Sequence, residues 1–100
     1  MSHSQCPKFE AATTLLSKRW VGLIVHTLLE GPARFHTLES RLKISPKVLS
    51  DRLKYLGEQD IVKRYVDDST PLSVHYALTP KGEALQGVLS AIEHWSKQWM

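Results

Sequence analysis

The stretch RFHTLESRLKISPKVLSDRLKYLG, residues 34–57, predicts two helices separated by a break of two or three residues. Ser45 and Pro46 mark the start of the second helix, because a hydroxyl side chain caps the first turn and proline suits the first helical position. The apolar stripe of the first helix is Phe35, Leu38 and Leu42, and that of the second is Leu49, Leu53 and Leu56. A short helix, a tight turn and a second helix are typical of a helix-turn-helix.

Two β-rich runs follow, IVKRYV (61–66) and SVHYAL (73–78), joined by a segment that begins with Asp67 and Asp68. In the second run Val74, Tyr76 and Leu78 alternate with two other side chains, which predicts a half-buried strand. A hairpin after a helix-turn-helix is a wing. We therefore expect an α+β, mostly α fold, a winged helix-turn-helix with additional N- and C-terminal dimerisation helices. The single domain covers 1–100, with the helix-turn-helix at about 34–58 and the wing at about 61–78.

The flanking segments predict three more helices. The first runs from Pro7 to about Ser17 and is amphipathic. The next, WVGLIVHTLLEG (20–31), is apolar nearly all round, predicts a buried central helix and ends at Gly31. A long last helix begins at Thr79 and Pro80 and covers about 80–99.

The composition narrows the function classes. One cysteine in 100 residues gives no internal disulfide framework, so we expect a cytoplasmic protein. No apolar run approaches the length of a membrane span, and we expect no signal peptide. The five histidines show no metal-ligand spacing, and a phosphate-binding glycine loop is absent, so we expect no metal, no cofactor and no enzyme. His26 is expected to be a hydrogen-bonded core or interface residue.

Positive charge is concentrated in the middle of the chain, where residues 41–64 carry seven basic and three acidic side chains. On a helix-turn-helix this distribution favours double-stranded DNA as the partner. Arg52 lies at the edge of the apolar stripe, and two roles for its guanidinium group stay open. It contacts a DNA phosphate, or it forms an ion pair with an acidic residue of the chain. The acidic start of the hairpin tip weakens any insertion of the wing into a minor groove. The predicted DNA-binding residues are Arg34, Ser45, Pro46, Lys47, Ser50, Asp51, Arg52, Lys54, Lys63 and Arg64.

The apolar residues of the last helix exceed what one small domain covers, which predicts a homodimer. Such a dimer would read a two-fold symmetric operator with half-sites one helical turn apart. The other interpretation is an intramolecular core stripe, and part of the set has that role. The predicted interface residues are Phe9, Leu16, Leu85, Val88, Leu89, Ile92, Trp95 and Trp99.

Several motifs in order resemble the HxlR-type winged-helix transcription regulators of bacteria, which are distant relatives of the MarR family. They are CPKFE (6–10), LLSKRW (15–20), GLIVHTLLEGPARF (22–35), ISPKVLSDRLKYL (44–56) and VHYALTPKGEAL (74–85). The opening is especially similar to the YodB/CatR-like subgroup, which represses genes for detoxifying quinones and other electrophiles. The resemblance implies a repressor in which Cys6 is the sensor. Ser73 replaces a basic wing residue frequent in the family, and the second cysteine of some members is absent.

Cys6 precedes Pro7 as Ser45 precedes Pro46, so it has the pattern of a helix cap with sulfur in place of oxygen. The helix N-terminus and Lys8 favour its thiolate form. The products open to a lone thiol are an S-adduct with a quinone or other electrophile, a mixed disulfide, or a Cys6–Cys6 link between subunits. We expect modification to shift the first helix against the last helices, change the half-site spacing and release DNA. The alternative interpretation is that Cys6 is a small apolar residue that packs against the dimer partner and has no sensing role.

A second kind of regulation stays open. Trp20, Tyr76 and Trp95, with Trp99, are candidates for an aromatic pocket near the dimer interface. Such a pocket would bind a small aromatic effector without a covalent bond, and the protein would then be a ligand-gated repressor.

Overall fold

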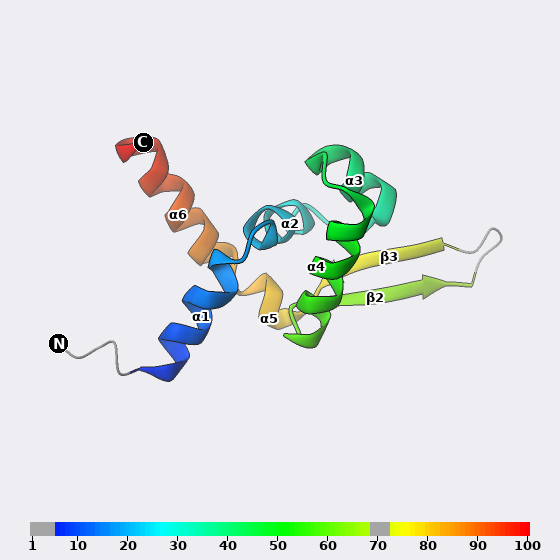
Figure 1. Cartoon of the computed structure of the whole chain (residues 1–100), viewed down its shortest axis with the longest axis horizontal. Helices are drawn as coiled ribbons and strands as arrows, with labels where there is room; N and C mark the ends of the chain where they lie inside the picture. Colours follow the sequence, from blue (N-terminus) through cyan, green and yellow to red (C-terminus); the bar gives the residue numbers. More distant parts are fainter. Residues whose placement is uncertain (1–5, 69–72) are drawn as a thin grey trace.

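The computed structural model describes residues 6–68 and 73–100 of the chain, so His3 and residues 69–72 of the hairpin tip lie outside the described part. Figure 1 shows a central body of helices, with the hairpin extending from one end and two helices extending from the other. The elements in chain order are α1 (Pro7–Ser17), α2 (Val21–Leu28), β1 (Ala33–Arg34), α3 (Phe35–Leu42), α4 (Pro46–Glu58), β2 (Val62–Asp67), β3 (Ser73–Leu78), α5 (Pro80–Glu83) and α6 (Gln86–Trp99).

All three helix starts that the sequence places before a proline are confirmed. In each, the backbone N–H three residues on donates to the cap side chain: to Cys6 Sγ at 3.4 Å, to Ser45 Oγ at 3.3 Å and to Thr79 Oγ1 at 3.1 Å. Each cap residue has extended backbone angles, as an N-cap requires. The cysteine therefore has the local role of a capping hydroxyl.

The core forms where α2, α3 and α4 meet the start of the wing. Its fully or almost fully buried side chains include Val21, Ile24, Val25, Leu38, Leu49, Leu56 and Ile61. The expected buried central helix α2 is confirmed on one side only, because Leu23 is 56% exposed and His26, expected in the core or at an interface, is exposed as well. These two side chains lie on the side of α2 where α6 leaves an open cavity.

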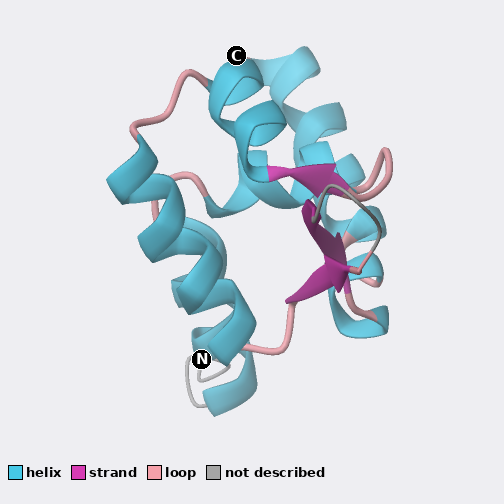
Figure 2. Cartoon of the chain, turned by 90° about the vertical axis from the view of Figure 1, so that its right-hand side faces the viewer, coloured by secondary structure: helices cyan, strands magenta, loops and turns pink. Residues whose placement is uncertain are grey.

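The sheet has three antiparallel strands in the order β1-β3-β2. The two-residue strand β1 is too short to show an alternating pattern and was not expected; it pairs Ala33 with Tyr76 and Arg34 with His75. The expected alternation of burial along β3 is not seen, since every residue of β3 is half-buried. Both faces of this central strand lie against other segments. Tyr76 lines a hollow beside α4, and His75 lines a hollow beside α2. Figure 2, viewed from the wing end, shows how small this sheet is beside the helices.

The prediction of a single long C-terminal helix is also wrong, because a turn at Ala84 and Leu85 divides this segment into α5 and α6. The short helix α5 is anchored to the start of the wing: Lys81 Nζ donates to the Gln59 carbonyl oxygen at 2.8 Å, and the buried Gly82 packs directly against the carbonyl group of Ile61. The N–H of Leu85 then bonds three residues back to Gly82 at 3.0 Å, which tightens the turn. This anchor sets the direction in which α6 leaves the body.

The helices α1 and α6 project from the body on the side opposite the wing (Figure 1), and α1 has no buried residue. The radius of gyration is 15.0 Å, against about 13 Å for a compact chain of this length. In the described part of the chain, none of the helices combines the length and apolarity that crossing a membrane would require.

Candidate DNA interface and thiol site

The outward face of α4 carries the polar side chains that the sequence analysis singled out. Ser45 and Pro46 lie exposed at the start of the helix, and Lys47, Ser50, Asp51 and Lys54 are exposed along it. The opposite face is anchored in the core, with Leu49 and Leu56 at 0% exposure. The predicted division of α4 into an inward and an outward face is therefore confirmed.

A hollow of about 320 Å³ lies between α4 and the wing. Ser50 and Lys54 line it from α4, and Arg64 lines it from β2. Two cations and a hydroxyl around one hollow form a cradle for an anionic group such as a phosphate. The neighbouring Lys63 takes no part in it, since its Nζ lies 5.3 Å from the ring centroid of Tyr65.

Arg34 lies apart from this hollow. It belongs to β1, makes no side-chain cap to α3, and lines a separate cavity of about 360 Å³ with His75 and Arg41. Arg41 is engaged within the chain, because its two terminal nitrogens donate to the Glu30 carboxylate at 3.1 Å each. The hydrogen bond from Arg41, and then its charge, hold the pKa of Glu30 below the usual value for a glutamate.

Arg52 has a role that differs from both expectations. Its Nε donates to the backbone carbonyl oxygen of Arg19 at 2.8 Å, so its bond goes to the turn between α1 and α2. The side chain is half-buried at the edge of the apolar face of α4. The structure thus brings together Ser50, Lys54 and Arg64, and it directs Arg52 away from them.

Cys6 is an exposed free thiol at the N-terminus of α1. Its sulfur accepts the N–H of Phe9, whose side chain is 62% exposed. The C-terminal half of α1 packs on the core through Leu15 and Leu16. A group attached to Cys6 would therefore lie at the free end of a helix whose other end is anchored.

Six of the eight predicted interface residues lie on α6 or at its N-cap, in two rows, and the other two, Phe9 and Leu16, lie on α1. Leu85 and Leu89 contact the core of the chain, and Leu16 packs beside them from α1. A second row stays exposed at spacings of four, three and four residues, which places its members on one side of the helix. This exposed row, which we call the α6 seam, is Val88 (43% exposed), Ile92 (50%), Trp95 (56%) and Trp99 (74%).

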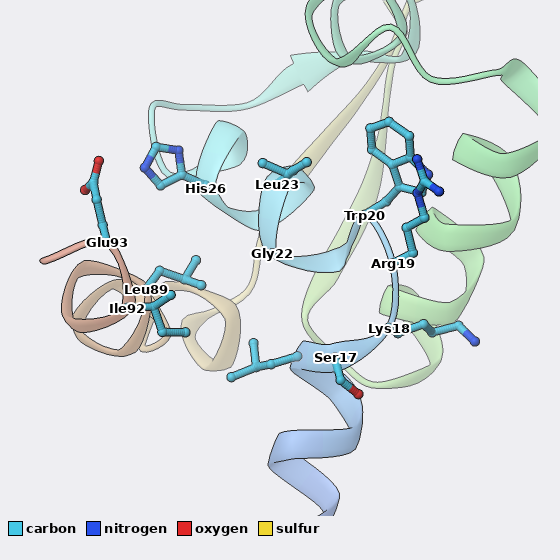
Figure 3. A pocket seen from close by; sticks show the side chains of 11 residues that line it. Ser17, Lys18, Arg19, Trp20, Gly22, Leu23, His26, Leu89, Ile92 and Glu93 are labelled. Carbon is cyan, nitrogen blue, oxygen red and sulfur yellow. The ribbon is translucent and has the colours of Figure 1, made fainter. Parts of the chain in front are cut away.

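The aromatic pocket is not assembled as expected. Trp20 lines a cavity of about 500 Å³ between the α1–α2 turn, α2 and α6, whereas Tyr76 lines the hollow beside α4. Trp95, the third predicted member, lies on α6 and lines neither of these two hollows. The wing and α6 extend from opposite ends of the body (Figure 1). Figure 3 shows the cavity beside Trp20, where Leu23 and His26 of α2 face Leu89, Ile92 and Glu93 of α6.

Residues 15–100 match the HxlR-like helix-turn-helix family. The chain belongs to this family. It is 46% identical over 100 residues to the HTH-type transcriptional regulator YodB of Bacillus subtilis, covering 99% of this chain and 89% of that protein. Like the other members, this HxlR-like protein is a transcription regulator of the helix-turn-helix class, and such regulators bind DNA.

Two solved structures of YodB from B. subtilis resemble the HxlR-like chain closely. The reduced form matches with a TM-score of 0.89 and 47% identity, covering 94% of this chain and 93% of that one. The quinone-bound form matches with a TM-score of 0.83 and 45% identity, covering 94% and 99%. The backbone described here is thus more similar to the reduced form, and the winged helix-turn-helix fold is confirmed.

Two features of the candidate sites in this HxlR-like chain were missed from its sequence. One is the cavity wall formed by Leu23, His26 and Glu93, which depends on how α6 crosses α2. The other is the contact of the turn residues 18–20 with α4, which joins residues more than thirty positions apart. The sequence predicted the break between the first two helices, but no sequence pattern indicated that the residues of this break would contact α4.

Proposed function

We propose that the protein is a homodimeric DNA-binding repressor that is released from its operator when an electrophile or oxidant modifies Cys6. The observation that carries the proposal is the exposed Cys6 thiol at the free end of α1, in a chain 46% identical to a regulator with a solved quinone-bound structure. DNA binding, dimerisation and thiol chemistry each have separate support.

The outward face of α4 supports binding in a major groove. Lys47 and Ser50 lie in its first turns, where a recognition helix reaches the base edges. Lys54 and Arg64 flank the hollow beside the wing and would hold a phosphate of the DNA backbone. Binding of this kind should weaken steeply with salt, since each neutralised phosphate releases counterions.

The α6 seam supports a second copy of the chain as the dimer partner. Four large apolar side chains exposed in a single row are costly to leave in water. Their 4-3-4 spacing is that of helices which pack along a shared seam. A two-fold pairing of α6 helices would place two α4 helices on one symmetric operator.

The proposed chemistry at Cys6 is the addition of its thiolate to a quinone. A bond forms between Sγ and a ring carbon, a ring electron pair moves to one carbonyl oxygen, and that oxygen takes up a proton. The proton of the attacked ring carbon then moves to the other oxygen, so the quinone is reduced to an S-aryl hydroquinone and no group leaves. The arylated sulfur is a bulky and poor acceptor for the Phe9 N–H, so the first turn of α1 loses its cap. Displacement of α1 would then alter the pairing of the two subunits.

The test is fluorescence anisotropy with the promoter DNA upstream of the protein's own gene, before and after treatment with benzoquinone. We expect tight binding by the reduced protein, loss of binding after treatment, and no loss for Cys6→Ser. Serine is a better cap than cysteine, so this variant removes the thiol and keeps the helix start. A Cys6→Ser protein that still loses DNA in quinone would refute the thiol switch.

A non-covalent effector remains the second candidate, favoured by the cavity of about 500 Å³ beside Trp20. Its walls are mainly apolar, with Leu16, Leu23 and Ile92 among them, which suits a small aromatic molecule. Under this candidate, dilution alone restores DNA binding after exposure to the effector. A covalent adduct at Cys6 survives dilution.

A further inference from the structure

The α1–α2 turn, residues 18–20, is fastened to α4 at two points. Arg52 Nε donates to the Arg19 carbonyl oxygen at 2.8 Å, and Lys18 Nζ lies 4.9 Å from the ring centroid of Tyr55. Arg52 and Tyr55 are three residues apart, so they lie on the same side of α4. Figure 3 shows the Lys18 side chain pointing away from the cavity, toward the ribbon of α4.

The turn itself is a stiff element. Trp20 has φ = 77°, a left-handed conformation that is rare for a bulky side chain and persists only where the surroundings enforce it. The N–H of Val21 closes the turn on the Lys18 carbonyl at 3.2 Å, and the N–H of Ile24 bonds to the Trp20 carbonyl at 2.9 Å. The direction of the Arg19 carbonyl is therefore set by the positions of α1 and α2.

The fastening acts on α4, the helix whose outward face we propose as the DNA-contacting surface. Leu49, Leu53 and Leu56 hold α4 to the core through nonpolar contacts, which are weakly directional. A hydrogen bond from a charged guanidinium group to a carbonyl oxygen is directional, and it is stronger than a hydrogen bond between two neutral groups. It therefore adds a defined rotational setting to a helix whose outward face carries Ser50 and Lys54.

We propose that the Arg52–Arg19 hydrogen bond and the Lys18–Tyr55 contact form a latch through which the position of α1 sets the orientation of α4. Arg52 is then a positioning residue, not a phosphate contact. The proposal rests on the proposed function in one respect, that modification of Cys6 displaces α1. Such a displacement moves the Arg19 carbonyl, weakens the latch and lets α4 turn out of its DNA-binding orientation.

The first test separates positioning from phosphate binding through salt dependence. We compare the native protein with Arg52→Met, which keeps the aliphatic stem, and with Lys54→Met, placed here at the DNA. Removal of a phosphate contact lowers the slope of log affinity against log salt by about one. We expect Lys54→Met to show this change, and Arg52→Met to keep the native slope while losing about tenfold in affinity. A slope lowered by about one in Arg52→Met would overturn the proposal.

The second test measures transmission, which is the effect of Cys6 modification on DNA binding. It is expressed as the ratio of the dissociation constants for DNA after and before benzoquinone treatment. We expect this ratio to fall several-fold in Arg52→Met and in Arg52→Lys, since lysine keeps the charge but lacks the Nε donor. An unchanged ratio in both variants would overturn the latch. Lys18→Met changes an exposed side chain, should lower the ratio as well, and serves if the Arg52 variants do not fold.

The two proposals fail in different ways. A native protein that binds DNA tightly and ignores benzoquinone refutes the thiol switch, and with it the transmission part of the latch. The salt slopes of the reduced proteins still decide whether Arg52 positions α4. A native protein that responds, with Arg52 variants that respond equally, refutes the latch alone.

Discussion

Replacing Gly82 with alanine tests whether the anchor of α5 on the wing holds the C-terminal part of the fold together. A β-carbon at residue 82 would overlap the carbonyl oxygen of Ile61 and would lie 3.1 Å from Leu78 Cδ2 and 3.2 Å from Ile61 Cγ2. The oxygen belongs to the backbone where β2 begins, so it has no rotamer by which to move away.

The expected size follows from two opposing effects. Overpacking in a well-packed site costs about 1–3 kcal/mol, and a backbone clash lies at the upper end of that range. Alanine in place of glycine in a helix recovers about 0.5–1 kcal/mol. We therefore expect Gly82→Ala to lower the free energy of unfolding by about 2 kcal/mol, and the melting temperature by about 8–16 °C.

Gly57→Ala is the matched control. Gly57 lies in α4, and a β-carbon there would meet only the Val62 carbonyl oxygen at 3.8 Å, an ordinary contact. This control should raise the free energy of unfolding by about 0.5–1 kcal/mol. Thermal and urea unfolding at equal protein concentration measure both variants. A Gly82→Ala protein as stable as the native one would show that the close packing of α5 on the wing is not what fixes α6.

Three other changes have defined outcomes. The free energy of unfolding of Cys6→Ser should lie within about 0.5 kcal/mol of the native value. By intact-mass spectrometry this variant should show no mass increase after benzoquinone treatment. Equal labelling of both proteins would show that another residue reacts. Ile92→Glu in the α6 seam should give monomers by analytical ultracentrifugation and remove the dependence of melting temperature on protein concentration, unless the chain pairs through another surface. Because Arg41 lowers the pKa of Glu30, their pair stabilises the fold above the unfolded-state pKa of Glu30 and loses this effect as pH falls through the lowered folded-state value. Melting of native and Glu30→Gln proteins across acidic pH should therefore converge at low pH, and a difference that grows in acid would contradict the assignment.

Much of the candidate site was readable from local pattern. The outward face of α4 followed from the spacing of Leu49, Leu53 and Leu56, since helical periodicity alone places Lys47 and Ser50 opposite them. The cap at Cys6 followed from its place before Pro7. The role of Arg52 did not follow, because an arginine at the edge of an apolar stripe can reach in several directions.

Local sequence patterns were enough to predict the order of the helices, their capped starts, the helix-turn-helix with its hairpin, and the family. These features depend on interactions among near neighbours in the chain, whose geometry is fixed by backbone periodicity and capping chemistry. Three features could not be predicted in this way and depend on long-range packing. They are the break between α5 and α6, the strand β1, and the fastening of α4 to the turn before α2. Each of these depends on a backbone carbonyl or N–H that meets a distant segment, as Gly82 meets Ile61 and Arg52 meets Arg19. Every residue carries the same backbone groups, so residue type does not reveal which carbonyl will be used until the chain has packed.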